Sequence, residues 1–435
     1  MRPPWWGPGG TDIRWRLGKL VRGRVEEVTH GSVPSVCVDA NERIRASFAR
    51  VERRADHVAK YFYSHLFARN PGVRELFPAD MSEQRDRLFA ALTHVVQRLD
   101  DPGLPRYLAT LGRDHRKFDA RPEHYAAVGE SLIAALRFGL PNTWDEETEQ
   151  AWLGAYKILS EAMIGGSEEA DKRQAPRWWD CRVVARHAAA PGVTVLTLLP
   201  DRTLPYAAGQ FVSVSTPKVP RVWRPYSIGC APRADRTIDL HVSRVDGGLL
   251  SPVLVDRTAP DDTLRLGSPA GTAVLPKRAG QPVTFIAAGT GWAPVRALLE
   301  EMVHRWTPTT ARLFLVARSP AHLYDPEAVD ALRKHHSWVD VTVITPEGME
   351  RQGATAHRLE AALSAHRDWA KHRVYVSGPA QFIAEVRELV RGYGTPPEQI
   401  AHDHVPSPER ASREPGHSAW FLHPSQPQWI NPADR

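Results

Sequence analysis

Apolar residues recur at every third or fourth position through the first third of the chain, which is the pattern of helices with one buried face. One stripe spans residues 44–62, and Asn41 just before it is expected to cap the first helix. Two more stripes span residues 125–136 and 152–163, and Pro122 stands near the start of the former, where its missing N–H costs little. The pattern predicts a helical domain up to about residue 165.

After a charged link around residues 168–176, the periodicity changes to short runs rich in β-branched residues. The runs at 193–199, 211–215 and 238–242 are separated by turn residues, which is typical of a small antiparallel barrel. Beyond them, strand patterns alternate with helical ones, which predicts a parallel, doubly wound sheet. The expected strands lie at 283–287, 312–317, 339–344 and 374–377, and the expected helices at 297–303 and 381–390.

The expected fold class is therefore multidomain: an all-α domain, an antiparallel β-barrel and an α/β doubly wound domain. A chain of 435 residues is also too long for one hydrophobic core. Residues 1–38 are rich in Gly, Pro and Arg without a sustained period, so we interpret them as a disordered tail or as a mis-assigned translation start. The helical domain is expected at 39–170, the barrel at 176–278, the α/β domain at 279–406 and a second disordered tail at 407–435.

Charge and composition exclude several kinds of protein. The net charge is +6, but half of it lies in residues 1–37 and the rest of the chain interleaves both signs, so no nucleic-acid partner is expected. No apolar run approaches roughly eighteen residues, so no integral membrane association is expected. The N-terminus lacks a secretory signal, and Cys37, Cys181 and Cys230 form neither a disulfide framework nor a zinc motif. A monomer in the cytoplasm is the expectation.

A histidine completes a further apolar stripe. Leucines in residues 104–111 step by four and three, and His115 follows four positions later. A helical histidine that faces a core is more often a packing residue than a metal ligand. Here, however, the segment Leu-Gly-Arg-Asp-His-Arg-Lys-Phe at 111–118, followed by Arg-Pro-Glu-His-Tyr at 121–125, resembles the proximal region of flavohaemoglobin globin domains. The resemblance implies a haem b group whose iron is bound by His115.

Upstream segments resemble the distal side of the same family's haem pocket. They are Tyr-Phe-Tyr-Ser-His-Leu-Phe, Leu-Phe-Pro and Met-Ser-Glu-Gln-Arg-Asp-Arg-Leu-Phe, which begin at residues 61, 76 and 81. The resemblance implies that Tyr63 and Gln84 form the distal polar pair. It also implies that Phe77 packs on the porphyrin and that Leu88 lies over the iron. A phenol O–H can donate a hydrogen bond to O₂ in this pocket, although Tyr63 can also be interpreted as a core tyrosine.

The family also has a tyrosine and a glutamate beside the proximal histidine. Tyr125 matches the tyrosine, and alignment of residues 151–156 with the last globin helix brings Glu169 to the glutamate position. A carboxylate that accepts the Nδ1–H of His115 would make the imidazole a stronger donor to iron. Glu168 is the neighbouring alternative, and a solvated acidic helix end is the other interpretation of Glu169.

The barrel carries a flavin motif. Arg224-Pro-Tyr226-Ser227 follows directly on a strand and resembles the Arg-x-Tyr-Ser signature of ferredoxin-reductase-type FAD domains. The resemblance implies that Arg224 binds the FAD pyrophosphate, that Tyr226 lies against the isoalloxazine ring and that Ser227 bonds the flavin edge. A guanidinium suits phosphate and a flat aromatic ring suits a flat flavin. The segment Tyr-Ala-Ala-Gly-Gln-Phe, which begins at Tyr206, precedes this motif at a distance that fits the family.

A Gly-Gly–Ser stretch follows the flavin motif. Gly247 and Gly248 precede Ser251 and an apolar run, and the backbone N–H groups of this stretch can hold a second phosphate. A glycine turn without a ligand is the alternative. The segment Gly-Ser-Pro-Ala-Gly at 267–271 also fits the family's order.

The α/β domain carries a nucleotide motif. The residues Gly289, Thr290, Gly291 and Pro294 lie in a strand–turn–helix run that matches the Gly-Thr-Gly-x-Ala-Pro turn of the reductase family. The turn formed by Ser377, Gly378 and Pro379 matches the family's last strand and is expected near the nicotinamide.

The α/β domain departs from the family's pattern at two positions and leaves the choice between NADH and NADPH open. Ser377 stands where the family usually has cysteine, and Val405 stands where an aromatic residue usually covers the flavin, with Asp403 as the preceding acid and His404 as a partial substitute. Arg318 follows the second strand and can grip a 2′-phosphate, assisted by Arg351, so both NADH and NADPH are open as donors.

The resemblance covers roughly residues 41–405. It implies a nitric oxide dioxygenase that passes electrons from NAD(P)H through FAD to haem and uses O₂ to convert nitric oxide to nitrate. The alternative is an NAD(P)H-dependent flavin reductase with a sensor globin and another electron acceptor.

Overall fold

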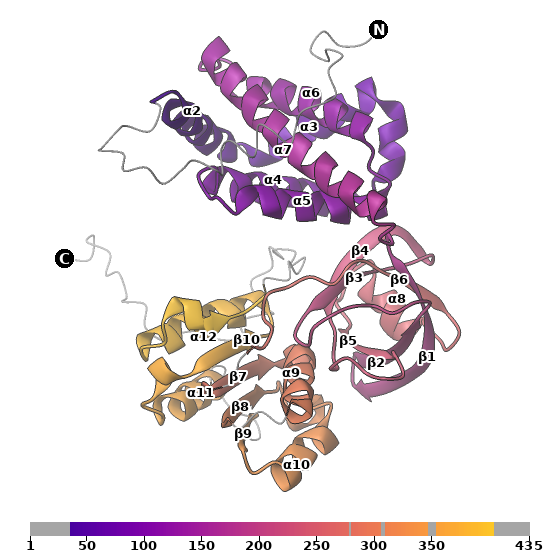
Figure 1. The fold of residues 1–435 in the computed structure, drawn as a ribbon, viewed down its shortest axis with the longest axis vertical. Coiled ribbons are helices and arrows are strands. Elements are labelled where there is room, and N and C mark those ends of the chain that lie inside the picture. The colour runs from indigo at the N-terminus through magenta and orange to yellow at the C-terminus, as the bar shows by residue number, and fades with distance from the viewer. Residues whose placement is uncertain (1–34, 278–279, 306–308, 347–353, 404–435) are drawn as a thin grey trace, which may run out of the picture.

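The computed structural model of the chain describes residues 35–277, 280–305, 309–346 and 354–403. The first part is helical, the second is an antiparallel barrel and the third is a parallel α/β unit (Figure 1). This order confirms the expected fold class. Both expected tails lie outside the described residues, apart from residues 35–38.

The helical unit comprises α2 (Ser35–Glu52), α3 (Ala55–Arg69), η1 (Pro71–Leu76), α4 (Ser82–Gln97), α5 (Leu104–His115), η2 (Arg116–Phe118), α6 (Pro122–Gly139) and α7 (Glu146–Lys172). Two expectations about its first helix are wrong. The helix begins at Ser35 and not at Asn41, whose side-chain amide donates to Asp100 at 2.7 Å. The apolar stripe over residues 44–62, which was expected to be continuous, also covers two helices. The first helix ends at Glu52 and the next begins at Ala55, and both bury their apolar positions in one core.

Two glycines allow α5 and α7 to pack with their backbones in contact. A Cβ atom at Gly112 would lie 1.9 Å from the carbonyl oxygen of Met163, and one at Gly166 would lie 2.1 Å from that of Ala109. Any side chain at either position would therefore force the two helices apart. Since α5 ends at His115, these glycines fix the position of the histidine's helix.

Replacement of Gly166 by Ala is expected to destabilise the helical unit by about 2 kcal/mol, because the added methyl group meets backbone that cannot move aside. Gly165 is the matched control, since a Cβ there meets nothing within 4 Å. Gly165→Ala should stabilise the helix by about 0.5 kcal/mol. Urea unfolding followed by helical circular dichroism measures both changes, and equal effects of the two variants would contradict this account.

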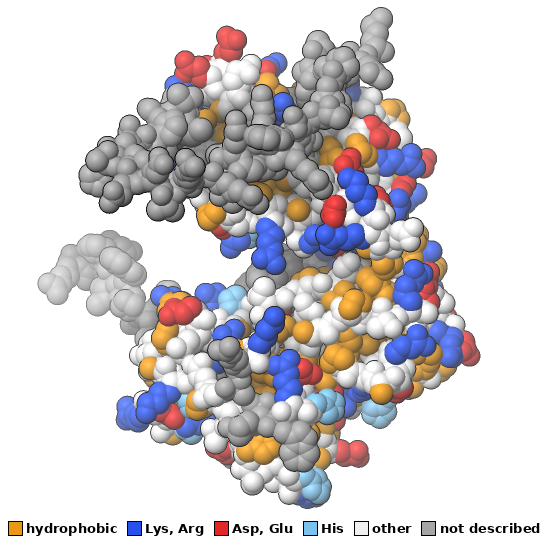
Figure 2. Space-filling view, viewed as in Figure 1, with side chains coloured by type: hydrophobic (Ala, Val, Ile, Leu, Met, Phe, Trp, Pro, Cys, Tyr) orange, Lys and Arg blue, Asp and Glu red, His pale blue; other side chains and the backbone are white. Residues whose placement is uncertain are grey.

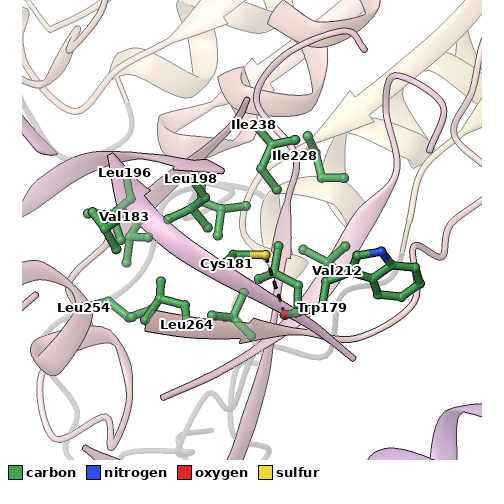
Figure 3. Packing of buried hydrophobic residues seen from close by; sticks show 14 of the residues in the cluster. Trp179, Cys181, Val183, Leu196, Leu198, Val212, Ile228, Ile238, Leu254 and Leu264 are labelled. Atoms are coloured by element: carbon green, nitrogen blue, oxygen red, sulfur yellow. Dashed lines mark hydrogen bonds between the residues drawn. The ribbon is translucent and has the colours of Figure 1, made fainter. Parts of the chain in front are cut away.

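The barrel comprises β1 (Trp179–Ala190), β2 (Val193–Pro200), β3 (Phe211–Thr216), β4 (Val219–Ser227), β5 (Ile238–Ser243), α8 (Ser251–Asp256) and β6 (Thr263–Leu266). The strands form one antiparallel sheet in the order β4-β3-β6-β1-β2-β5, and a bridge between Ile228 and Leu240 brings its two ends together. Burial alternates along the start of β1, where Trp179, Cys181 and Val183 point into the apolar core shown in Figure 3.

The α/β unit comprises β7 (Val283–Ala288), η3 (Gly289–Gly291), α9 (Trp292–His304), β8 (Ala311–Val316), η4 (Pro320–His322), α10 (Pro326–His335), β9 (Val339–Ile344), α11 (Ala354–Ser364), η5 (Trp369–Lys371), β10 (Arg373–Ser377), α12 (Ala380–Gly392), η6 (Pro397–Gln399) and β11 (Ile400–Ala401). Its parallel sheet has the order β11-β10-β7-β8-β9. Residues of α9 and α10 cover one face, and residues of α11 and α12 cover the other. The first core also includes Val193, Ala208 and Ala231 of the barrel, so the two units share a hydrophobic interface.

The surface is consistent with the charge pattern of the sequence. In Figure 2, basic and acidic side chains lie side by side along the visible edge of the helical unit. Within the described ranges, none of the helices has both the length and the apolar character that a membrane crossing requires.

Candidate functional site

His115 ends α5 and has the protonation pattern that a metal ligand needs. Its Nδ1–H donates to the carbonyl oxygen of Leu111 at 2.8 Å, which leaves the lone pair on Nε2. Burial lowers the pKa of His115, so the ring is held in its neutral form. A neutral imidazole with a free Nε2, oriented by a backbone carbonyl, fits an axial ligand of haem iron.

The structure does not bring Glu169 to His115. Glu169 is exposed at the end of α7 and pairs with Arg173 at 2.8 Å, and Glu168 is exposed as well. The expected carboxylate–histidine pair is therefore wrong, because a carbonyl one turn back along α5 already accepts the Nδ1–H. A carbonyl carries less negative charge than a carboxylate, so it increases the donor strength of the imidazole less.

Tyr125 lies near this histidine's helix, in a small cluster with Leu108, Leu111 and Met163. Burial raises the pKa of Tyr125 to about 12, so its phenol stays protonated. The backbone at this point is held by Tyr156, whose hydroxyl donates to the Tyr125 carbonyl at 2.6 Å.

The expected distal residues lie on α3, directly after η1 and on α4. The ring centroids of Tyr63 and Phe77 are 5.6 Å apart, and Leu88 packs against the same core. The Tyr63 hydroxyl donates to the backbone carbonyl of Gln84 at 3.2 Å, so the contact with Gln84 is made by its main chain. Burial raises the pKa of Tyr63, which keeps the phenol a hydrogen-bond donor.

The flavin motif occupies the end of β4. Arg224 is 9% exposed and donates to the carbonyl of Trp223 at 2.9 Å. Tyr226 packs against the barrel core, and burial raises the pKa of its hydroxyl. A buried guanidinium next to a half-buried aromatic ring suits the diphosphate and ring of a flavin nucleotide.

Three other expected flavin residues have partners within the protein. The Tyr206 hydroxyl donates to the Ala231 carbonyl at 3.0 Å. The Gly248 N–H donates to the Val245 carbonyl, and the Ser251 hydroxyl accepts from the Val245 N–H, both at 3.0 Å. The Gly247–Ser251 stretch is thus a closed turn before α8, with Gly247 in the left-handed region at φ 71°.

The two nucleotide turns meet at the carboxyl ends of neighbouring parallel strands. Thr290 lies in η3 between the two glycines, and Pro294 lies in the first turn of α9. A Cβ atom at Gly291 would lie 2.4 Å from the carbonyl oxygen of Ser377, so glycine alone permits this contact. Gly289 and Gly378 both have positive φ, which L side chains rarely adopt. This edge of a doubly wound sheet is where nucleotides bind.

A shallow pocket opens beside the same turns, lined by Gly289, Trp292, Leu315, Val316, Ala317, His322, Leu323, Tyr324 and Asp325. Arg318 is exposed next to it, at the end of β8. Arg351, His404 and Val405 lie outside the described residues.

Asp403, the described acid of the C-terminal motif, reaches back to the barrel. It accepts the Thr272 N–H at 2.8 Å, and a Cβ at Gly271 would lie 2.4 Å from its Oδ2. Burial raises the pKa of Asp403 above its usual value. This contact ties the end of the α/β unit to the barrel.

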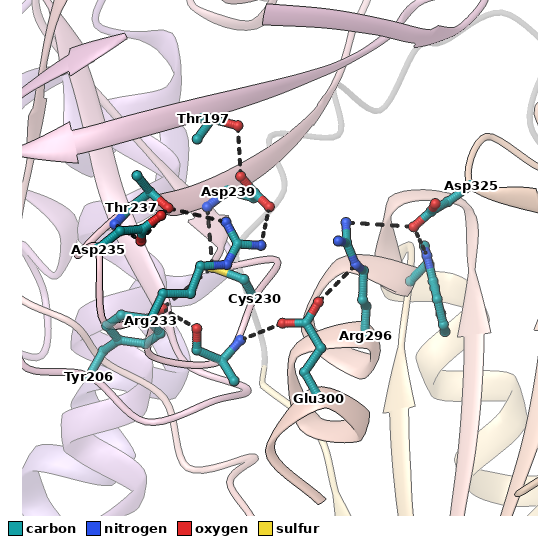
Figure 4. A network of polar contacts seen from close by, with 12 residues as sticks. Thr197, Tyr206, Cys230, Arg233, Asp235, Thr237, Asp239, Arg296, Glu300 and Asp325 are labelled. Atoms are coloured by element: carbon teal, nitrogen blue, oxygen red, sulfur yellow. Dashed lines mark hydrogen bonds and ion pairs between the residues drawn. The ribbon is translucent and has the colours of Figure 1, made fainter. Parts of the chain in front are cut away.

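The sequence motifs did not reveal a polar network between the barrel and the α/β unit (Figure 4). Glu300 of α9 accepts the Ala231 N–H of the barrel at 2.9 Å, and Arg296 joins Glu300 to Asp325 at 3.1 and 3.6 Å. Beside it, Arg233 and Asp239 form an ion pair at 2.6 Å. None of these residues belongs to a recognisable sequence motif. The one hint in the sequence is that charged residues of both signs stand near the edges of the two domains.

His241 and Tyr324 form a second contact across this interface. The Nδ1 of His241, on β5, lies 2.8 Å from the Tyr324 hydroxyl, and both residues are buried. The other ring nitrogen of His241 is buried without a hydrogen-bond partner. Burial lowers the pKa of His241 to about 4, with the neighbouring Arg296 adding to the shift. The ring is therefore neutral at pH 7.

Three protein-family models match consecutive parts of the chain. The Globin model matches residues 60–163, the Oxidoreductase FAD-binding domain matches 181–274 and the Oxidoreductase NAD-binding domain matches 285–388. These three segments correspond to the helical unit, the barrel and the α/β unit.

Flavohemoproteins are similar to the chain along most of its length. The Flavohemoprotein of Deinococcus radiodurans is 27% identical over 379 residues, which cover 82% of this chain and 93% of that protein. The Flavohemoprotein of Bacillus subtilis is 25% identical over 390 residues, which cover 83% and 95%. The crystal structure of a flavohemoglobin from Malassezia yamatoensis with bound FAD and heme superposes with a TM-score of 0.66 at 18% identity, over 84% of this chain and 98% of that one, and shows a shared fold.

Proposed function

Since the chain belongs to the flavohaemoprotein family, with a globin domain fused to FAD-binding and NAD-binding oxidoreductase domains, we propose that it converts nitric oxide and O₂ to nitrate with electrons from NAD(P)H. Haem b and FAD would supply the redox chemistry. Each turnover joins one nitric oxide, one O₂ and one electron into nitrate, and one hydride supplies two such electrons.

The observation that carries the proposal is the state of His115. Its Nδ1–H is committed to the Leu111 carbonyl and its ring is neutral, so Nε2 is available to bind iron. The buried phenol of Tyr63, on α3 of the same domain, is a protonated donor. A nitrogen ligand to haem together with a phenol that could turn from the Gln84 carbonyl toward a bound ligand would favour O₂, since such a donor stabilises negative charge on oxygen.

The reductase residues have separate roles in this proposal. Arg224 would bind the flavin diphosphate, and Tyr226 would hold the ring in the orientation that receives hydride. The paired turns at Gly291 and Ser377 would place the nicotinamide against the flavin. The serine hydroxyl is small enough to keep this approach open.

The deciding experiment is aerobic nitric oxide consumption by haem- and FAD-loaded protein, with and without NADH or NADPH. Nucleotide-dependent consumption that yields nitrate is the expected result, and the faster nucleotide identifies the donor. Oxidation of the nucleotide without loss of nitric oxide would overturn the proposal and favour a reductase with another electron acceptor.

Replacement of Tyr63 by Phe is expected to slow nitric oxide consumption by about a hundredfold, because one buried donor is lost where negative charge develops. Reduction of a dye by FAD should stay unchanged, since Tyr63 lies in the globin domain. Tyr61→Phe is the matched control, because Tyr61 lies on the same helix and stacks on Phe138 with 4.3 Å between ring centroids. Equal nitric oxide consumption by Tyr63→Phe and wild type would contradict the assigned role.

A further inference from the structure

Lys117 crosses the boundary between the globin domain and the FAD barrel. It lies in η2, two residues after His115, and its side chain is 6% exposed. Its ammonium nitrogen is 2.6 and 2.7 Å from the two carboxylate oxygens of Asp114 and donates to the Ser213 hydroxyl of β3 at 2.8 Å. The cation thus has one partner in the globin and one in the barrel.

Two aromatic rings surround the same ammonium group. It lies 5.1 Å from the ring centroid of Phe118 and 5.4 Å from that of Trp223, and these two rings meet edge to face at 6.3 Å. A cation between aromatic rings is attracted by both, and more strongly when water is excluded. We call Lys117, Phe118, Ser213 and Trp223 the interdomain joint.

The joint is closely fitted on the barrel side. A Cβ atom at Gly267 would lie 2.3 Å from the Ser213 hydroxyl and 3.5 Å from the Lys117 side chain. Next to it, the buried guanidinium of Arg116 pairs with Asp171 at 2.7 Å and donates to the Ala175 carbonyl at 2.7 Å. Burial of a cation at a boundary is costly unless it finds partners there, so the contacts of Lys117 with Asp114 and Ser213 favour one relative placement of the domains.

The joint also connects the two candidate cofactor sites. On the globin side, η2 continues directly from the helix that ends at His115. On the barrel side, Trp223 directly precedes Arg224, and Ser213 pairs in register with Pro225 inside the flavin motif. A displacement of the joint would therefore move the histidine and the flavin motif relative to each other.

We propose that the interdomain joint is a positioning device that holds the globin on the barrel at the separation required for electron transfer from flavin to haem. This role rests on the proposed function. Domain interfaces within one chain are free to move unless specific contacts fix them, and transfer between two bound groups is sensitive to small misplacements. NAD(P)H would be the reductant: its hydride carries two electrons, which would pass one at a time through FAD to ferric haem, and one proton would be released to solvent.

The test uses Lys117→Met, which keeps the apolar stem and removes the ammonium group. In anaerobic stopped-flow experiments on loaded protein, bleaching of the flavin by NADH should keep its rate. Reduction of the haem should slow by about tenfold, because the contacts that fix the domain placement are lost. Lys117→Arg should restore most of the rate, since arginine keeps the charge and stacks on aromatic rings. Lys60→Met is the control, because Lys60 pairs with Asp56 at 2.6 Å on an exposed surface of the same domain.

A second readout requires no electron transfer. Trypsin can cut the link between the domains after Arg173 and Arg177, whose side chains are 74% and 46% exposed. Loss of the joint should let the domains separate, so the link in cofactor-free Lys117→Met should be cut faster than in wild type or Lys60→Met. Ser213→Ala removes one hydroxyl, so it should change both readouts in the same direction as Lys117→Met but by a smaller amount. If Lys117→Met does not fold, Ser213→Ala provides the test.

The outcomes separate the two proposals. If haem reduction and trypsin cleavage are unchanged in Lys117→Met and Ser213→Ala, the proposed role of the joint is wrong, while the proposed function stands. The same conclusion follows if haem reduction slows equally in Lys60→Met. Wild-type protein in which NADH and NADPH reduce the flavin but the haem stays ferric would overturn the proposed function, and the role of the joint with it.

Discussion

Replacement of His115 by Ala is expected to abolish stable haem binding and reduce nitric oxide consumption to background, while dye reduction through FAD continues. The imidazole is the one described group at the end of α5 whose ring nitrogen is oriented for iron, because Leu111 accepts the other ring N–H. Without it, the chain would lose the nitrogen ligand that is proposed to hold the haem iron.

The measurement is the haem content of purified protein, read from its Soret absorbance against FAD absorbance, followed by the nitric oxide assay. His57→Ala is the matched control, since His57 is an exposed histidine on α3 of the same domain. Wild-type haem content and activity in His115→Ala would overturn the assignment of the ligand. Loss of FAD together with haem would show that the substitution had unfolded the whole chain.

The second large effect expected is a loss of stability of the two reductase domains as the pH falls from about 6.5 to about 4. His241 has its pKa lowered from 6.5 to about 4 by burial at the interface between the barrel and the α/β unit. In this window the unfolded chain binds a proton and the folded chain does not, so the free energy of unfolding falls as the pH falls. The stabilisation is fully present above pH 6.5, and the shift corresponds to about 3 kcal/mol lost by pH 4.

Urea unfolding of the wild type and of His241→Gln at pH 7 and pH 4.5 isolates this contribution. The amide of Gln can still bond the Tyr324 hydroxyl but does not titrate, so the variant should lose less stability on acidification. His187→Gln is the control, because His187 is an exposed histidine on β1 of the same barrel. The same pH dependence in His241→Gln and wild type would refute the explanation.

Most of the architecture was predictable from local pattern. Strands such as β2 and β7 are apolar runs bounded by turn residues, and the structure places them within one residue of the expected bounds at 193–199 and 283–287. The first helix was misjudged because Asn41 has the chemistry of a cap, yet the helix extends back to Ser35 and the Asn41 amide bonds Asp100. Capping preference is a local signal, and a partner distant in sequence overrode it.

The candidate site was predictable where chemistry depends on neighbours in sequence. The segment at 111–118 and the run Arg224-Pro-Tyr226-Ser227 indicate candidate sites because the residue types proposed as iron ligand, phosphate contact and ring contact stand in short local motifs. The partner of the His115 Nδ1–H was mispredicted as Glu169, since the choice between a distant carboxylate and the Leu111 carbonyl depends on where α7 ends relative to α5.

The sequence by itself determined the order of the three domains and the residue types of each site, because periodicity and short motifs are properties of neighbouring positions. Only the tertiary structure decided which groups meet between domains. Lys117 and Trp223 are more than a hundred positions apart in the chain, as are Thr272 and Asp403. Contacts of this kind arise when whole domains dock, and their energy depends on burial and exact distance, which no local pattern records.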